Sequence, residues 1–143
     1  MLVSQILKSK TSGVQTIAPT ATVSDAVSQL AGRRIGALIV SSDGTTAEGI
    51  LSERDIVRAL GLTGSGCLTA GIDSVMTRNP VSCAPGDTAD EVLQKMTDGR
   101  FRHMPVIEEG QMVGLISIGD VVKARLMELA AEKDALEGMI KGF

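Results

Sequence analysis

The chain contains an internal repeat, and this feature limits the folds open to it more than any other. Two units of roughly 50 residues carry like residues at matching positions, and a unit of that size is too small to bury a sheet securely alone. The matching pairs, at a shift of 66 residues that becomes 65 after the second turn, are Pro19 and Pro85, Thr22 and Thr88, Arg34 and Arg100, Val40 and Val106, Gly44 and Gly110, Gly49 and Gly114, Ser52 and Ser117, Asp55 and Asp120, and Val57 and Val122. The sequence therefore predicts two like units that pack against each other.

Each unit shows the same succession of signals, namely strand, helix, strand, strand and helix. Thr22 and Thr88 are typical N-caps, each followed by apolar residues at spacings of three and four. Gly44 and Gly110 mark the turns between the later strands, which are rich in apolar residues. The predicted strands are residues 14–17, 35–40, 49–51, 81–83, 104–107 and 112–116. We expect an α+β fold of two βαββα repeats with pseudo-twofold symmetry, sheets packed together, and two equivalent clefts where the repeats meet.

The units also predict how the chain is divided. A short helix is expected before each unit, at residues 3–7 and 72–76, and the Gly-, Ser- and Thr-rich stretch 61–71 is expected to be a linker. We expect residues 1–66 to form the first repeat with an N-terminal helix. Residues 67–143 are expected to form the second repeat with a C-terminal helix, and the two together one module.

The C-terminal helix carries an apolar stripe of its own. Leu126, Leu129, Leu136 and Ile140 follow one another at steps near three and four, interrupted by Lys133. This spacing resembles a coiled-coil seam. Packing on the same domain, contact across a dimer and docking of a partner all remain open, and a symmetric homodimer is the expected oligomer.

Composition and charge exclude several classes of protein. Phe101 and Phe143 are the aromatic residues, so stacking platforms for single-stranded nucleic acid are absent. A net charge of -3 gives no overall positive field, and nucleic acid is an unexpected partner. The chain shows neither an apolar run long enough for a bilayer nor a signal peptide, so we expect a cytoplasmic protein without membrane contact.

The cysteines suggest neither disulfide nor metal chemistry. Cys67 and Cys83 lie far from each other and from His103, the single histidine, so no zinc-ligand spacing is present. His103 invites an enzymatic hypothesis because its ordinary pKa lies near neutrality. No nucleophile or orienting partner is marked for it, and we expect no catalytic residues and no requirement for a metal.

The strongest functional signal is the pair GILSERD and GLISIGD, which end in Ser52-x-x-Asp55 and Ser117-x-x-Asp120. One interpretation is a capping box, in which each serine and aspartate satisfies the backbone amides of a helix start. Another uses the same geometry for a ligand: the helix start and serine attract phosphate, and the carboxylate accepts ribose hydroxyls. The two interpretations are compatible, and the motif alone does not decide between them.

Basic residues cluster near these motifs. Arg54 and Arg58 flank the first motif, while Arg100, Arg102 and His103 precede the central strand of the second unit. Guanidinium groups engage phosphate in a bidentate manner, which favours the ligand interpretation. Solvated helix faces and strand edges are the alternative interpretation of the same residues.

This set of motifs resembles a tandem pair of CBS domains, and most closely the small bacterial proteins made only of that pair. The resemblance covers nearly the whole chain and rests on VQTIAPTATVSDAV, IGALIV and SERDIVRAL in the first unit and NPVSCAPGDTADEVL, FRHMPV and ISIGDVV in the second. It implies a Bateman module that dimerises into a flat disc. It also implies clefts for AMP, ADP or ATP, and sometimes NAD(H) or S-adenosylmethionine, with AMP the leading expectation.

The resemblance also implies roles for single residues. It places Asp55 and Asp120 on ribose and Ser52 and Ser117 on phosphate. The further nucleotide-binding residues that we expect are Arg54, Arg102 and His103 near phosphate, and Thr16, Ser82, Gly36, Ala37, Leu38 and Met104 around the base. The first unit has Gly36 and Ala37 where the second has Arg102 and His103, so the two clefts should differ in phosphate preference.

The function expected from these residues is regulatory. The chain would bind adenine nucleotides between its repeats and signal to a separate, unidentified effector protein, because a ligand shifts an equilibrium through its different affinities for two shapes. The alternative is a structural dimerisation or adaptor module, in which the Ser-x-x-Asp pairs serve as helix caps only.

Overall fold

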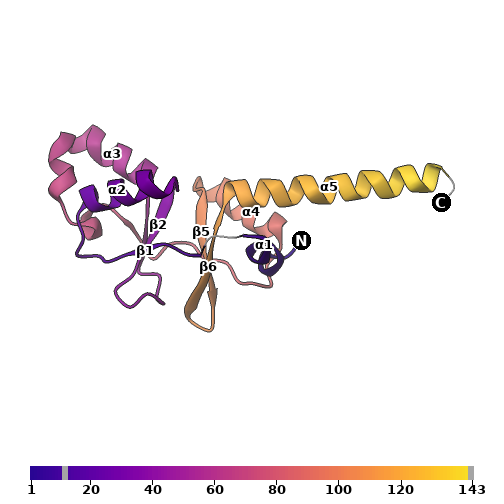
Figure 1. The fold of residues 1–143 in the computed structure, drawn as a ribbon, viewed down its shortest axis with the longest axis horizontal. Helices are drawn as coiled ribbons and strands as arrows, with labels where there is room; N and C mark the ends of the chain where they lie inside the picture. The colour runs from indigo at the N-terminus through magenta and orange to yellow at the C-terminus, as the bar shows by residue number, and fades with distance from the viewer. Residues whose placement is uncertain (11–12, 142–143) are drawn as a thin grey trace.

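The computed structural model describes residues 1–10 and 13–141 and contains the two predicted units (Figure 1). The first unit comprises β1 (Thr16–Ile17), α2 (Val23–Arg33), β2 (Ala37–Val40), β3 (Gly49–Ser52) and α3 (Glu53–Thr63). The second comprises α4 (Ala89–Gly99), β5 (His103–Glu108), β6 (Gln111–Ser117) and α5 (Ile118–Ile140). The segments that lead into them are α1 (Val3–Ser9) for the first, and the 3-10 helices η1 (Gly64–Thr69) and η2 (Ile72–Ser74) with β4 (Thr77–Arg78) for the second.

The sheets confirm the α+β prediction with one exception. In the first sheet the order is β1-β2-β3-β4, with β1 parallel to β2 and the other pairs antiparallel. The second sheet is the antiparallel pair β5-β6. A strand over 81–83 is wrong: Cys83 alone makes a parallel bridge, to Val106. Pro80 and Pro85 flank this stretch and have no amide hydrogen to extend the pairing.

The helix boundaries follow the predicted signals. Thr22 and Thr88 are the N-caps of α2 and α4, each accepting a hydrogen bond from the amide three residues later. Both helices end at an arginine in the left-handed conformation, Arg34 at φ 55° and Arg100 at φ 56°. These residues turn the chain out of each helix and into β2 or β5, so both guanidinium groups lie at equivalent places.

Each unit is completed by the segment that leads into the other. Val3 and Ile6 of α1 are buried in the core of the second unit, beside α4, β5 and β6. Ile72 of η2 is fully buried in the core of the first unit. The predicted linker 61–71 is therefore ordered rather than a free connection: α3 runs to Thr63, η1 follows, and Cys67 is buried.

The two sheets meet in a small apolar core between the units. Ala37, Ile39 and Ile50 of the first sheet form a buried cluster against which Met112 and Leu115 of β6 pack. A backbone hydrogen bond of 2.8 Å from the amide of Met112 to the carbonyl of Thr45 links the units further. This core fixes the positions of β2, β3, β5 and β6, which border the clefts described below.

The C-terminal helix leaves the body of the molecule. α5 is buried only at its start, at Val121 and Ala124, and its remaining turns project as a single arm (Figure 1). Leu126, Leu136 and Ile140 on this arm are exposed. Among the described residues, no helix is both long enough and apolar enough to cross a bilayer.

The glycine that opens each Ser-x-x-Asp motif makes room for a neighbouring segment. A Cβ on Gly49 would lie 2.5 Å from Met76 Sδ and 3.0 Å from the carbonyl oxygen of Thr77. A Cβ on Gly114 would lie 2.7 Å from Cδ2 of Leu7 on α1. Because neither glycine has a side chain, the segment at Met76 and Thr77 can pack against the first unit, and Leu7 of α1 can pack against the second.

We expect Gly49→Ala to lower the free energy of unfolding by about 1–3 kcal/mol, because the new methyl group overpacks the contact between β3 and β4. Urea unfolding followed by circular dichroism measures this change. Gly32→Ala is the matched control: no atom lies within 4 Å of that Cβ position on α2, and alanine there should be neutral or stabilising. Equal stability of Gly49→Ala and Gly32→Ala would contradict the prediction.

Candidate functional site

Two clefts lie where the units meet. Cleft A has a volume of about 470 Å³ and is lined by residues 13–15 and 34–37, together with Lys10, His103, Leu115 and Ser117. Cleft B has a volume of about 430 Å³ and is lined by residues 52–55, 79–81 and 99–103, together with Gly36, Arg58 and Thr77. Both volumes suit a small organic ligand.

The clefts are pseudo-symmetric. Residues 13–15 and 34–36 of cleft A are the repeat equivalents of residues 79–81 and 100–102 of cleft B. Each cleft thus combines the entry segment of one unit, and the turn that follows its helix α2 or α4, with residues of the Ser-x-x-Asp motif of the other unit. The site belongs to the pair of units, and one unit alone lacks half of each cleft.

The motif of cleft B forms a capping box at the start of α3. The amide of Ser52 donates to Asp55 Oδ2 at 2.8 Å, and Ser52 Oγ accepts from the amide of Asp55 at 3.3 Å. Asp55 Oδ1 has only distant neighbours, Thr77 Oγ1 at 3.5 Å and an Arg58 nitrogen at 3.8 Å. The carboxylate thus serves the cap through one oxygen and turns the other toward residues that line the cleft.

The motif next to cleft A forms the same capping box at the start of α5, with a cation added. The amide of Ser117 donates to Asp120 Oδ2 at 2.9 Å, and Ser117 Oγ accepts from the amide of Asp120 at 3.2 Å. Lys10 Nζ also donates to Asp120 Oδ2, at 2.8 Å. Burial raises the pKa of Asp120, but the hydrogen bonds from Lys10 and the Ser117 amide outweigh it and hold that pKa below its ordinary value.

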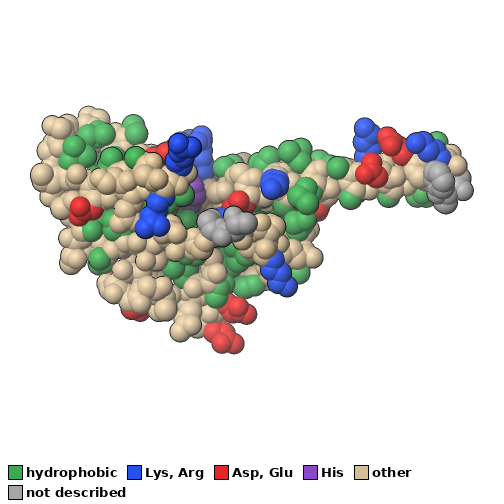
Figure 2. Space-filling model, viewed as in Figure 1, with side chains coloured by type: hydrophobic (Ala, Val, Ile, Leu, Met, Phe, Trp, Pro, Cys, Tyr) green, Lys and Arg blue, Asp and Glu red, His purple; other side chains and the backbone are tan. Residues whose placement is uncertain are grey.

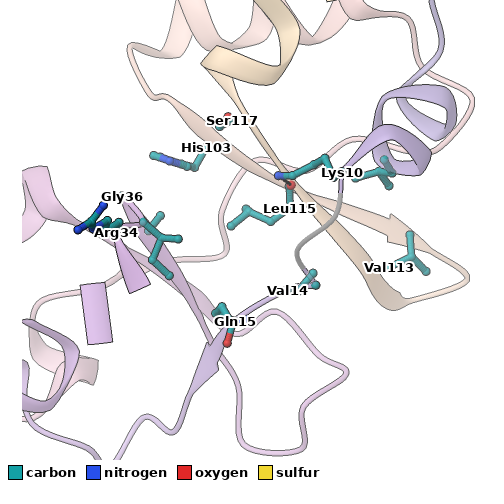
Figure 3. A pocket seen from close by; sticks show the side chains of 13 residues that line it. Lys10, Val14, Gln15, Arg34, Gly36, His103, Val113, Leu115 and Ser117 are labelled. Carbon is teal, nitrogen blue, oxygen red and sulfur yellow. Dashed lines mark hydrogen bonds between the residues drawn. The ribbon is translucent and has the colours of Figure 1, made fainter. Parts of the chain in front are cut away.

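His103 lies between the clefts and lines both. Its ring points from β5 toward Gly36 (Figure 3), where an added Cβ would lie 3.2 Å from its Cε1 and 3.3 Å from its Nε2. Burial lowers the pKa of His103 below 6.5, although nearby Glu53 opposes the shift. At neutral pH the imidazole is therefore uncharged.

Arginines gather around cleft B. The lining includes four arginines with exposed side chains and two carboxylates. These residues are Arg54, Arg58, Arg100 and Arg102, with Glu53 and Asp55. Figure 2 shows Lys and Arg side chains gathered beside the single histidine, between the two units. Cleft A is lined by two cations, Lys10 and Arg34. Cleft B thus offers more guanidinium groups to an anionic ligand.

The predicted site residues divide into two groups. The structure brings together in the clefts Ser52, Arg54, Asp55, Gly36, Ala37, Arg102, His103 and Ser117, with Asp120 joined to cleft A through Lys10. Leu38 and Met104 are fully buried in the two cores, because successive strand residues point to opposite faces and their neighbours Ala37 and His103 take the cleft side.

Two further predicted residues lie outside the cleft linings. Thr16 pairs with Ile39 in the first sheet and is half-buried there. Ser82 is exposed, and its carbonyl accepts a hydrogen bond from Lys95 at 3.4 Å. Both lie one residue beyond the cleft-lining segments 13–15 and 79–81, which places them past the edge of each cleft.

Sequence reasoning missed two basic residues of the site, Lys10 and Arg34, and placed Arg100 near the motifs without assigning it to a cleft. Arg34 and Arg100 were matched as repeat equivalents, and that match was a usable signal for equivalent places in the two clefts. Lys10 had no such signal, because its repeat equivalent is Met76, which packs against the first core. Its role depends on α1 packing against the second unit rather than its own.

Metal and cysteine chemistry find no support in the described part of the chain. Residues 1–10 and 13–141 contain no group of three or more His, Cys, Asp or Glu side chains suited to a metal ion. Cys67 and Cys83 are both buried as free thiols. Burial raises the pKa of the Cys83 thiol to about 11, so it is protonated at neutral pH.

A family comparison agrees with this geometry. The family described as CBS domain matches the chain twice, over residues 3–62 and 72–127. The chain therefore belongs to the CBS domain family and carries a tandem pair of its domains, as the repeat predicts. Each match starts at a leading segment and includes the Ser-x-x-Asp motif of its unit.

Individual relatives are similar along most of the chain. The mitochondrial CBS domain-containing protein CBSX3 of Arabidopsis thaliana is 35% identical over 125 residues, which are 85% of this chain and 61% of that protein. The Arabidopsis protein CBSCBSPB1 is 33% identical over 135 residues, 90% of this chain but 25% of that protein. The chain thus spans less than two thirds of these curated relatives.

Solved structures share the fold along their whole length. A CBS-domain containing protein from Agrobacterium tumefaciens has 41% sequence identity and a TM-score of 0.83, covering 87% of this chain and 99% of that one. A CBS domain protein from Pyrobaculum aerophilum, complexed with AMP, has 26% identity and a TM-score of 0.78, covering 92% and 99%.

We expect the His103 resonance to titrate with a pKa below 6.5, because burial between the clefts disfavours the imidazolium ion. Proton NMR of the ring measures this directly, since the chain has one histidine. Glu53→Gln should lower the pKa further by removing the nearby negative charge. A pKa at or above 6.5 in the wild-type protein would show that the ring is not buried as described.

Proposed function

We propose that the chain binds adenine nucleotides in the clefts between its units and acts as a regulatory module. The observation that carries this proposal is the meeting, in cleft B, of a Ser-x-x-Asp helix start with Arg54, Arg100 and Arg102. A helix start attracts phosphate, and arginine engages it in a bidentate manner. The AMP complex of the Pyrobaculum relative supports an adenosine ligand.

In cleft B we assign the ribose to Asp55 and the phosphate to Ser52 and the arginines. Asp55 Oδ1 makes no hydrogen bond or ion pair shorter than 3.5 Å among the described residues, so it can accept hydrogen bonds from ribose hydroxyls. The base would lie against Ile50, Val81 and Phe101, three of the apolar residues of this lining. The uncharged His103 adds a hydrogen-bonding group without adding charge.

The same assignment in cleft A gives the ribose to Asp120 and the phosphate to Ser117 and Arg34. Ala37 and Leu115 supply apolar contact there. Thr16, Ser82, Leu38 and Met104 would act only through the backbone that positions the clefts, since none of their side chains lines either one. AMP is the leading ligand, and ADP, ATP and NAD(H) fit the same chemistry.

Regulation requires that another molecule respond to whether the nucleotide is bound. Symmetric homodimers are the commonest oligomers, and the exposed Leu126, Leu136 and Ile140 on α5 offer a surface for a second copy or an effector. We propose a homodimer that passes its ligand state to a separate protein. The complete capping boxes at Ser52 and Ser117 favour one alternative, an adaptor in which these motifs only start helices.

The substitution Asp55→Asn distinguishes a nucleotide-binding module from an adaptor. If the carboxylate binds ribose, this variant should lose about 10- to 100-fold in AMP affinity, since a hydrogen bond to a charged group contributes about 1.5–3 kcal/mol. Isothermal titration calorimetry with AMP measures the affinity. Wild-type protein at an AMP concentration ~100 times the Kd should gain ~2.7 kcal/mol of apparent stability.

Asp25→Asn is the matched control for this experiment. Asp25 completes an equivalent capping box with Thr22 at the start of α2 but lines neither cleft. Both variants should lose at most ~1 kcal/mol of stability from the cap, while only Asp55→Asn loses affinity. Unchanged AMP affinity in Asp55→Asn, or no binding of AMP, ATP or NADH by the wild-type protein, would favour the adaptor.

A further inference from the structure

At cleft A, Lys10 already pairs with one oxygen of the carboxylate that the proposed function gives to ribose. Its ammonium donates to Asp120 Oδ2 at 2.8 Å and to the carbonyl oxygen of Leu115 at 2.8 Å. The side chains of Lys10 and Asp120 are 24% and 23% exposed, so water screens this ion pair only in part. A ribose that enters cleft A therefore meets a carboxylate with a partner in place.

Cleft B has no counterpart to this contact. The residue equivalent to Lys10 is Met76, whose thioether packs over Gly49. The nearest cation to Asp55 is Arg58, at 3.8 Å and on a side chain that is 71% exposed. The Asp55 side chain itself is only 11% exposed, but a contact of 3.8 Å with a cation that lies largely in water contributes little, so the carboxylate of cleft B is available without displacing a bound ammonium.

The charges of the linings act in the same direction. Four arginines line cleft B, whereas Lys10 and Arg34 are the cations lining cleft A, and Lys10 is engaged with Asp120. With the carboxylates included, Glu53 and Asp55 in cleft B and Asp120 beside cleft A, the formal charges are +2 (4 − 2) and +1 (2 − 1). A phosphate-bearing ligand is therefore attracted more strongly to cleft B, where the ion pair of Asp55 is long and involves an exposed arginine.

From these contacts we infer that Lys10 is an internal competitor for ribose, and that the two clefts fill in order, cleft B before cleft A. This inference rests on the proposed function, because it concerns the same ligand class. Asp120 does not itself line cleft A, whereas Lys10 does, so ribose hydroxyls reach this carboxylate only by displacing the Lys10 ammonium, and that displacement reduces the affinity of cleft A. Lys10 thus sets the concentration range over which the second nucleotide binds.

Calorimetric titration of AMP into wild-type protein, Lys10→Met and Lys8→Met tests the inference. The wild-type protein should show one tighter and one weaker site. Lys10→Met should tighten the weaker site about tenfold and leave the tighter site unchanged, since a partly buried ion pair no longer has to be broken. Lys8→Met, which removes an exposed lysine on α1, should behave as wild type.

Two further variants identify the sites. Asp55→Asn should weaken the tighter site about 10- to 100-fold, and Asp120→Asn should weaken the other site. Lys10→Gln, which is also uncharged, should reproduce the effect of Lys10→Met and replaces it if the methionine variant folds poorly. A weaker site that is unchanged or weakened in both Lys10 variants would overturn the competitor role, and loss of the weaker site would make Lys10 a ligand contact instead. Absence of any AMP binding in wild-type protein would instead overturn the proposed function.

Discussion

The packing of each leading segment onto the opposite unit is the constraint on which the rest of this structure depends. α1 completes the second core through Val3 and Ile6, and η2 completes the first through Ile72. Gly49 and Gly114 make this exchange sterically possible. Because of it, both clefts are built from two units whose relative position is fixed, and Lys10 reaches a motif 110 residues away in the sequence.

The pseudo-twofold axis explains why the two units differ at their centre. Equivalent residues approach one another at such an axis, and the space next to Gly36 is filled by the single imidazole of His103. The repeat equivalent of His103 is Ala37 and that of Arg102 is Gly36, so the first unit has a small residue at both positions. The departure from repeat symmetry thus has a steric reason, and it also gives cleft B an arginine that cleft A lacks.

The sequence predicted the α+β class, the two units and the N-caps because these depend on local chemistry and on the repeat itself. Ser52 and Asp55 could be placed at a cleft because their motif recurs at matched positions, and Arg102 and His103 because they form a basic cluster before the central strand of the second unit. Lys10 could not be found, since its partner Asp120 is reached only through exchanged packing. Leu38 and Met104 were expected around the base together with their sequence neighbours Ala37 and His103. Successive side chains of a strand point to opposite faces, so Leu38 and Met104 are buried in the cores instead. The binding roles of these residues remain predictions.

The length of α5 has a mechanical consequence. Its first turn holds the Ser117–Asp120 cap beside cleft A, and its 23 residues span about 35 Å from that cap to the free tip. A rigid helix acts as a lever pivoting at its fixed end. A tilt of ~5° at the cap therefore displaces the tip of α5 by ~3 Å. A movement of side-chain size at cleft A thus changes the position of the backbone far outside the cleft.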